Sequence, residues 1–192
     1  MKWLEDEIKN RGKVIDGNIL KVNSFLNHQL DPVLLDKISL LWYDHFNKKN
    51  VTKILTIESS GIALATLTAV RFKTNALFAK KGCSANLGET YSTTIHSYTK
   101  DKDVEICVEK AYLTKNDRIL IVDDFLATGS AIYGLIDLVN QSGATLVGIG
   151  VAIEKGFQGG GDKLRKDGYD LNSLEIIDAM DNDISNIKFR NN

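Results

Sequence analysis

One apolar run limits the folds open to this chain more than any other feature. Residues 119–122 are four consecutive branched aliphatic side chains, with no polar residue at alternate positions. A strand with one face in water alternates apolar and polar residues, so an unbroken apolar strand indicates burial on both faces. Such burial is typical of a parallel sheet with helices on either side. We therefore predict an α/β domain with a mainly parallel central sheet flanked by helices.

The rest of the chain alternates helical and extended patterns in support of that prediction. The apolar spacing predicts helices at 3–11, 32–48, 61–70, 130–141 and 162–166, and strands at 53–57, 76–80, 118–122, 146–153, 174–177 and 186–189. Two extended segments, 91–98 and 104–111, flank a polar turn and predict an inserted antiparallel hairpin. Since no linker or repeat interrupts the pattern, we expect a single domain over residues 1–192.

Charge and cysteine content exclude several classes of protein. The 24 basic and 25 acidic side chains give a net charge of −1, which provides no overall attraction to nucleic acid or to an anionic membrane. No apolar run approaches the roughly 20 residues that span a bilayer. Cys83 and Cys107 are too few for a disulfide framework, so we expect two separate thiols in a reducing cytoplasm. The acidic residues 5–7 are also unlike a basic targeting segment.

The chemistry is concentrated directly after the apolar strand. Asp123 and Asp124 follow the strand, and the small residues 127–130 then open a helix. Ligands of open α/β sheets bind at the carboxyl ends of strands, and a small-residue loop at a helix N-terminus offers backbone N–H groups to an anion. This combination favours a phosphate carried on a polyol, with the carboxylates accepting hydrogen bonds from hydroxyl groups. The alternative of a metal-holding strand paired with a P-loop fails, because residues 156–163 have aspartate where that motif needs lysine.

These residues resemble a known family. Residues 122–130, VDDFLATGS, are similar to the fingerprint of type I phosphoribosyltransferases, which bind 5-phosphoribosyl 1-diphosphate (PRPP). Segments 20–29, 57–63 and 153–158 are similar to the xanthine phosphoribosyltransferases of bacterial purine salvage. The resemblance covers nearly the whole chain. It implies the type I phosphoribosyltransferase fold, with the hairpin inserted as a hood and with both terminal segments contributing to the hood over the base.

The resemblance also implies an activity and a set of site residues. Such enzymes transfer the phosphoribosyl group from PRPP to N9 of xanthine, with Mg²⁺ bound together with PRPP, and they act as cytoplasmic homodimers. The implied residues are the catalytic Asp123 and Asp124 on the ribose hydroxyls; Ala127, Thr128, Gly129, Ser130 and Ala131 on the 5-phosphate; Leu20, Asn27 and Lys155 on xanthine; and Ser59, Ser60 and Gly61 beneath the diphosphate. We expect no metal held by protein ligands alone, since His28, His45 and His96 are dispersed.

Some positions depart from the family pattern. Ala127 stands where some related purine enzymes carry an aspartate for the N7 proton, so we expect xanthine to react as its monoanion. Thr128 replaces the asparagine of the xanthine branch. Residues 80–88 lack the usual hood pattern, which predicts altered closure over PRPP, and glycines 159–161 are expected to loosen the segment after Lys155.

Two alternative functions stay open. One is a related transferase that prefers guanine or hypoxanthine. The other, from a different class, is a regulator that senses PRPP without catalysis. Such a regulator needs an added DNA-binding module, and the residues before the first core strand contain no basic recognition helix.

Overall fold

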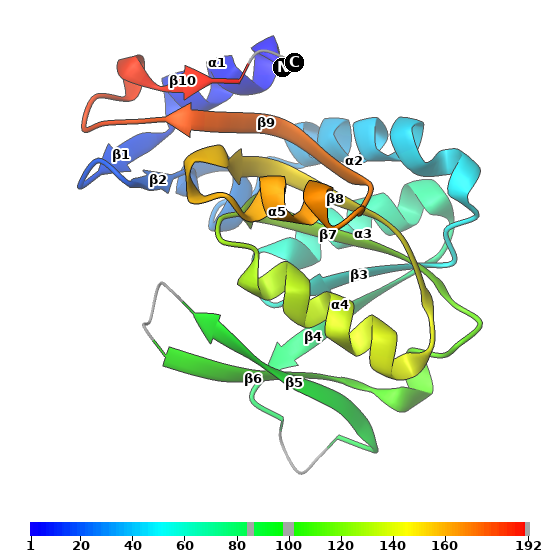
Figure 1. The fold of residues 1–192 in the computed structure, drawn as a ribbon. Coiled ribbons are helices and arrows are strands. Elements are labelled where there is room, and N and C mark those ends of the chain that lie inside the picture. Colours follow the sequence, from blue (N-terminus) through cyan, green and yellow to red (C-terminus); the bar gives the residue numbers. More distant parts are fainter. Residues whose placement is uncertain (84–86, 98–101, 191–192) are drawn as a thin grey trace.

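The computed structural model describes residues 1–83, 87–97 and 102–190, and its centre is a sheet of eight strands (Figure 1). The strands are β3 (Lys53–Ile57), β4 (Asn75–Lys81), β5 (Thr90–Ser97), β6 (Lys102–Glu109), β7 (Arg118–Leu126), β8 (Thr145–Lys155), β9 (Leu171–Ala179) and β10 (Lys188–Phe189). Their order is β10-β9-β8-β7-β3-β4-β6-β5. The central pairs β9-β8, β8-β7, β7-β3 and β3-β4 are parallel, while β10, β6 and β5 pair antiparallel. The predicted fold class is confirmed.

Strand β7 is buried on both faces, as its sequence predicts. Ile119 and Ile121 pack into one hydrophobic cluster, which includes residues of α4 (Ser130–Ser142) and Leu164 of α5 (Gly160–Lys166). Leu120 and Val122 pack into the other cluster, with residues of α2 (Pro32–Phe46) and α3 (Gly61–Phe72). Successive side chains of a strand point to opposite faces, so one short apolar run supplies both cores.

The helices begin and end close to the predicted positions. Helix α1 covers Lys2–Arg11, and Asp31 caps α2 by accepting a hydrogen bond from the Leu34 N–H at 3.2 Å, with Pro32 in the first helical position. After α2 the chain forms a short 3-10 turn, and this turn ends at Asn50, whose φ of 52° is left-handed. Among the described residues, none of the helices combines the length and the apolar character that a membrane crossing needs.

The sequence-based prediction missed some short elements and ended the strand β7 too early. Strands β1 (Lys13–Ile15) and β2 (Ile19–Lys21) form a small hairpin, followed by a π-helical turn at Asn23–Asn27. Strands of three residues are too short to show a periodicity. Strand β7 also continues to Leu126, since Asp123 still pairs with Val151 of β8, so both aspartates lie within the strand rather than after it. The predicted turn of the β5–β6 hairpin falls on residues 98–101, which lie outside the described residues.

The two cysteines are joined, and the prediction of separate thiols is wrong. Cys83, directly after β4, forms a disulfide with Cys107 of β6, with a Cα–Cα distance of 5.9 Å. In the antiparallel register Cys107 pairs with Lys80, and the left-handed Gly82, with a φ of 83°, bends the chain after β4 so that Cys83 reaches Cys107. A sequence separation of 24 residues does not reveal this contact. The disulfide therefore attaches the segment that follows β4 to the hairpin. Part of that segment, residues 84–86, lies outside the described residues.

The disulfide predicts a defined thiol count and a measurable contribution to stability. Protein unfolded without reductant should show no thiol that reacts with Ellman's reagent, and reduction should expose both. Opening a loop of this length should lower the free energy of unfolding by about 3 kcal/mol, because the unfolded chain regains conformational freedom. Urea unfolding with and without reductant measures this difference. Two reactive thiols in the untreated protein would contradict the pairing.

Candidate active site

A cavity of about 540 Å³ opens at the carboxyl ends of β7 and β3. Two described segments line it continuously: residues 123–126 at the end of β7 and residues 127–132, which lead into α4. The remaining lining comes from three short stretches. They are Ile57, Glu58 and Ser60 at the end of β3 and just after it, Lys81 and Gly82 at the end of β4, and Ile95, His96, Lys102 and Val104 of the β5–β6 hairpin. The structure thus brings together the carboxylates, the small-residue loop and part of the loop after β3. Sequence reasoning missed the contribution of the hairpin side chains.

Two nearly buried carboxylates form the floor of the cavity. Asp123 and Asp124 are only 5% and 6% exposed. The Asp123 carboxylate accepts the Asp124 N–H at 2.9 Å, and the Asp124 carboxylate accepts the Ser60 hydroxyl at 3.0 Å. Burial, and then the negative charge of Asp124, raise the pKa of Asp123 well above its usual range, while Lys81 acts in the opposite direction. These oxygens are acceptors held in place for donors that enter the cavity.

The loop from Ala127 to Ala131 has the geometry of an anion site. All five of its residues line the cavity, and Gly129 has a φ of 90°, a left-handed conformation that glycine adopts without strain. Helix α4 starts directly afterwards, and the first N–H groups of a helix have no acceptor within it. The Ser130 hydroxyl accepts the His96 N–H at 3.1 Å, which ties the hairpin to the start of α4. The loop can therefore surround a phosphate with backbone donors.

The loop after β3 packs closely against the carboxylates. A Cβ atom on Gly61 would lie 2.0 Å from the Thr56 Oγ1 and 3.0 Å from the Asp123 Oδ1, so a larger residue has no room there. Ser60 contacts Asp124, whereas Ser59 is exposed and does not line the cavity. The peptide bond between Glu58 and Ser59 is cis. Of the three residues expected beneath the diphosphate, Ser60 is the one that reaches the cavity.

None of the three residues expected at the base is part of the cavity lining. Lys155 ends β8, and its Nζ donates to the Asn18 carbonyl at 3.2 Å and lies 5.8 Å from the centre of the Phe125 ring. Burial lowers the pKa of Lys155. Leu20 is buried on β2, and the buried Oδ1 of Asn27 has no hydrogen-bond partner. Because Phe125 lines the cavity, its ring connects Lys155 to it. Sequence reasoning missed Phe125, although it directly follows the two aspartates.

Comparison with known proteins agrees with this geometry. The family model described as phosphoribosyl transferase domain matches residues 28–191. The xanthine phosphoribosyltransferase of Bifidobacterium animalis subsp. lactis is 52% identical, and that of Bifidobacterium adolescentis 50% identical, each over 99% of this chain and 100% of the relative. Among solved structures, adenine phosphoribosyltransferase from Thermoanaerobacter pseudethanolicus has a TM-score of 0.75 at 25% identity, covering 90% of this chain and 98% of its own.

The carboxylate pair predicts a pH-dependent cost to stability. Folding raises the pKa of Asp123, so the folded state binds its proton more tightly, and stability falls as pH rises from about 3.9 through the raised value. The variant Asp123→Asn keeps the side-chain shape but cannot ionise. In urea unfolding without ligand, the free energy of unfolding of this variant should rise relative to that of the wild type between pH 4 and pH 8. The rise should be about 1.4 kcal/mol for each unit by which folding raises the pKa of Asp123.

A second substitution serves as a control for this explanation. Asp124→Asn removes the neighbouring charge that helps to raise the pKa of Asp123, so its stability should depend less on pH than that of the wild type. A stability difference between Asp123→Asn and the wild type that stays constant over this pH range would contradict the assignment.

Proposed function

The chain belongs to the phosphoribosyltransferase family, and from this premise we propose that it transfers the 5-phosphoribosyl group of PRPP to N9 of xanthine. The products are xanthosine monophosphate and diphosphate, and the role is purine salvage. The observation that carries the proposal is the placement of a buried carboxylate pair and a glycine-containing loop at one end of the sheet. The assignment of xanthine as the base is supported by relatives that are named xanthine phosphoribosyltransferase and are about 50% identical over their full length.

The loop and the carboxylates position the sugar phosphate. Backbone N–H groups of residues 127–131, at the N-terminus of α4, bind the 5-phosphate. Asp123 and Asp124 accept hydrogen bonds from the ribose hydroxyls, and the Ser60 hydroxyl holds the Asp124 carboxylate in place. Positive charge develops on the ribose ring as the diphosphate leaves, as in glycoside cleavage. The protein therefore acts mainly by orienting the reactants and by stabilising charge.

We propose that Mg²⁺ enters with PRPP. Among the described residues, no group of three or more His, Cys, Asp or Glu side chains is placed to hold a metal. Asp123 and Asp124 alone supply too few oxygens for a protein-only magnesium site, but they fit a cation that keeps substrate oxygens as its other ligands. When bound, Mg²⁺ would neutralise negative charge on the departing diphosphate. Of the residues after β3, Ser60 would lie beneath that group.

Lys155 and Asn27 supply the chemistry for recognising an oxopurine. The Lys155 ammonium donates hydrogen bonds, so it suits the O6 carbonyl and disfavours the donor-only amino group of adenine. The buried Oδ1 of Asn27 has no partner, and an N–H of xanthine would provide one. Leu20 would cover the base with apolar surface. Because Ala127 offers no carboxylate, we propose that xanthine reacts as its monoanion.

A panel of purines tests the proposed function against its alternatives. The purified protein is incubated with PRPP, Mg²⁺ and xanthine, guanine, hypoxanthine or adenine, and nucleotide formation is followed by absorbance. We expect the highest kcat/KM for xanthine. A higher value for guanine or hypoxanthine would move the preference within the oxopurines, and activity on adenine without xanthine would overturn the base assignment. PRPP binding without turnover of any base would indicate a regulator.

We also propose a cytoplasmic homodimer without nucleic-acid or membrane partners. PRPP carries several negative charges and does not cross a bilayer unaided, so its consumers act where it is made. Val33 of α2, Val70 of α3 and Phe78 of β4 are exposed apolar side chains, which suit contact with a second subunit.

The role of Lys155 predicts a selective loss of base binding. Lys155→Ala should raise the KM for xanthine at least tenfold and the KM for PRPP less than threefold, because in our proposal the ammonium contacts xanthine and not PRPP. Lys166→Ala, which removes an exposed lysine of α5, is the matched control and should change neither value. Equal increases in both KM values would remove Lys155 from the base site.

The lowered pKa of Lys155 predicts a pH dependence of base binding. Burial makes the ammonium lose its proton below the ordinary lysine value of about 10.4, so kcat/KM for xanthine should fall on the alkaline side before that pH is reached. This limb should move to higher pH in Lys155→Arg, because guanidinium keeps its charge. Ionisation of xanthine itself affects both proteins equally and serves as the internal reference. An unchanged limb in the arginine variant would contradict the assignment.

A further inference from the structure

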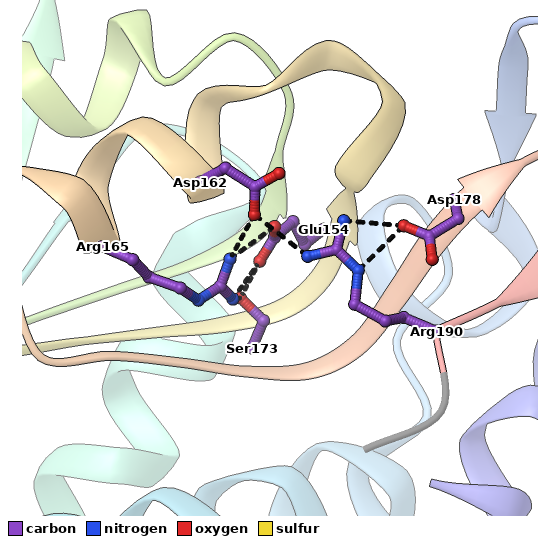
Figure 2. Close-up of polar contacts among 6 residues, drawn as sticks. All are labelled: Glu154, Asp162, Arg165, Ser173, Asp178 and Arg190. Atoms are coloured by element: carbon purple, nitrogen blue, oxygen red, sulfur yellow. Dashed lines mark hydrogen bonds and ion pairs between the residues drawn. The ribbon is translucent and has the colours of Figure 1, made fainter.

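An ion pair with a buried carboxylate lies one residue before Lys155 (Figure 2). Glu154 of β8 is 0% exposed, and its two oxygens accept hydrogen bonds from Arg165 of α5 at 2.9 and 2.6 Å. Ser173 of β9 donates a third hydrogen bond to the same carboxylate. A bidentate pair with these partners is strong and directional, whereas losing one partner would leave an uncompensated buried charge. The pair therefore fixes α5 against β8 and β9.

A second arginine extends this network along α5. Arg190, which follows β10, donates to Asp178 of β9 at 2.9 Å and to Asp162 of α5 at 3.0 Å. The hydrogen bonds that Arg165 donates to Glu154 raise the pKa of Arg165, so that its guanidinium stays charged. Figure 2 shows these groups side by side, bridging α5, β8, β9 and the chain end. Helix α5 is thus held at two of its charged residues, Asp162 and Arg165.

The start of α5 presses on the backbone of the loop from Ala127 to Ala131. The Gly160 N–H donates to the Ala127 carbonyl at 3.2 Å. A Cβ atom on Gly160 would lie 2.3 to 2.6 Å from backbone atoms of Ala127, Thr128 and Gly129, and one on Gly161 would lie 2.0 Å from the Glu154 carboxylate. Glycine at both positions is what permits this contact. The packing argues against our expectation that these glycines loosen the segment.

We propose that Glu154, Arg165 and Gly160 are positioning residues for the phosphate site. The ion pair holds α5 in place, and Gly160 of α5 contacts the Ala127 carbonyl. This contact fixes the orientation of the peptide groups that follow Ala127, and therefore the direction in which their N–H groups point. None of the three residues lines the cavity. The inference rests on the proposed function in one respect, namely that the anion held by the loop is the 5-phosphate of PRPP.

Gly160→Ala tests the contact directly. Adding one methyl group should push the loop out of shape and weaken PRPP binding, measured by titration calorimetry with Mg²⁺, at least tenfold, or about 1.4 kcal/mol. The KM for xanthine should change less than threefold. Gly168→Ala is the control, since Gly168 is left-handed with a φ of 88° and has open space around it, so alanine strains the backbone without touching the site. Unchanged PRPP affinity in Gly160→Ala would overturn the proposal.

The ion pair is tested with a double variant, because Arg165→Met alone leaves a buried charge and could prevent folding. Glu154→Gln/Arg165→Met removes both charges together. It should unfold near the wild-type temperature and yet bind PRPP at least fivefold more weakly. Arg71→Met, which breaks the surface pair between Arg71 of α3 and Asp36 of α2, is the matched control and should leave PRPP binding unchanged. A stable double variant with wild-type PRPP affinity would show that the pair is merely structural.

Failure of this inference is distinguishable from failure of the proposed function. If the wild type converts xanthine but Gly160→Ala binds PRPP equally well, only the positioning role falls. If the wild type binds PRPP without converting any purine, the proposed function falls, and calorimetry still decides the positioning role. Absence of PRPP binding by the wild type would overturn both.

Discussion

Strand β7 is buried on both faces, and the positions of the functional side chains follow from that burial. Ile119 and Ile121 pack towards α4, while Leu120 and Val122 pack towards α2 and α3. A strand held this firmly at the centre of a parallel sheet delivers its carboxyl end to one defined place. Asp123 and Asp124 lie at that end, next to a loop that opens a helix. Burial of the apolar side chains of β7 therefore fixes the position of the two carboxylates at its carboxyl end.

The carboxylates at this end are costly to the unliganded protein. Two adjacent acids with little exposure repel each other and lose hydration, which is why the pKa of Asp123 is raised. Glu154 is also fully buried, but its charge is met by Arg165 and Ser173. The difference separates two uses of a buried acid. Glu154 is satisfied within the fold, whereas we propose that the aspartate pair gains its remaining donors from a ligand.

Segments far apart in the sequence complete the site through short hydrogen bonds. The hairpin reaches the start of α4 through His96 and Ser130, the loop after β3 reaches Asp124 through Ser60, and α5 reaches Ala127 through Gly160. Each contact is short and involves small side chains or main chain. The loop beside α4 is therefore supported from several elements at once, which is how a site keeps the geometry that orientation of reactants requires.

The sequence by itself determined the α/β class, the parallel centre of the sheet, the capped start of α2 at Asp31, and the family to which residues 122–130 belong. These features depend on local patterns: unbroken apolar runs, helix caps, and a compact motif whose parts are neighbours in the chain. Tertiary structure alone decided the pairing of Cys83 with Cys107, the short β1–β2 hairpin, the place of Phe125 between Lys155 and the cavity, and the close packing of glycines 160 and 161. These depend on distances between residues that strand order and helix packing bring together, and no pattern along a single chain encodes such distances.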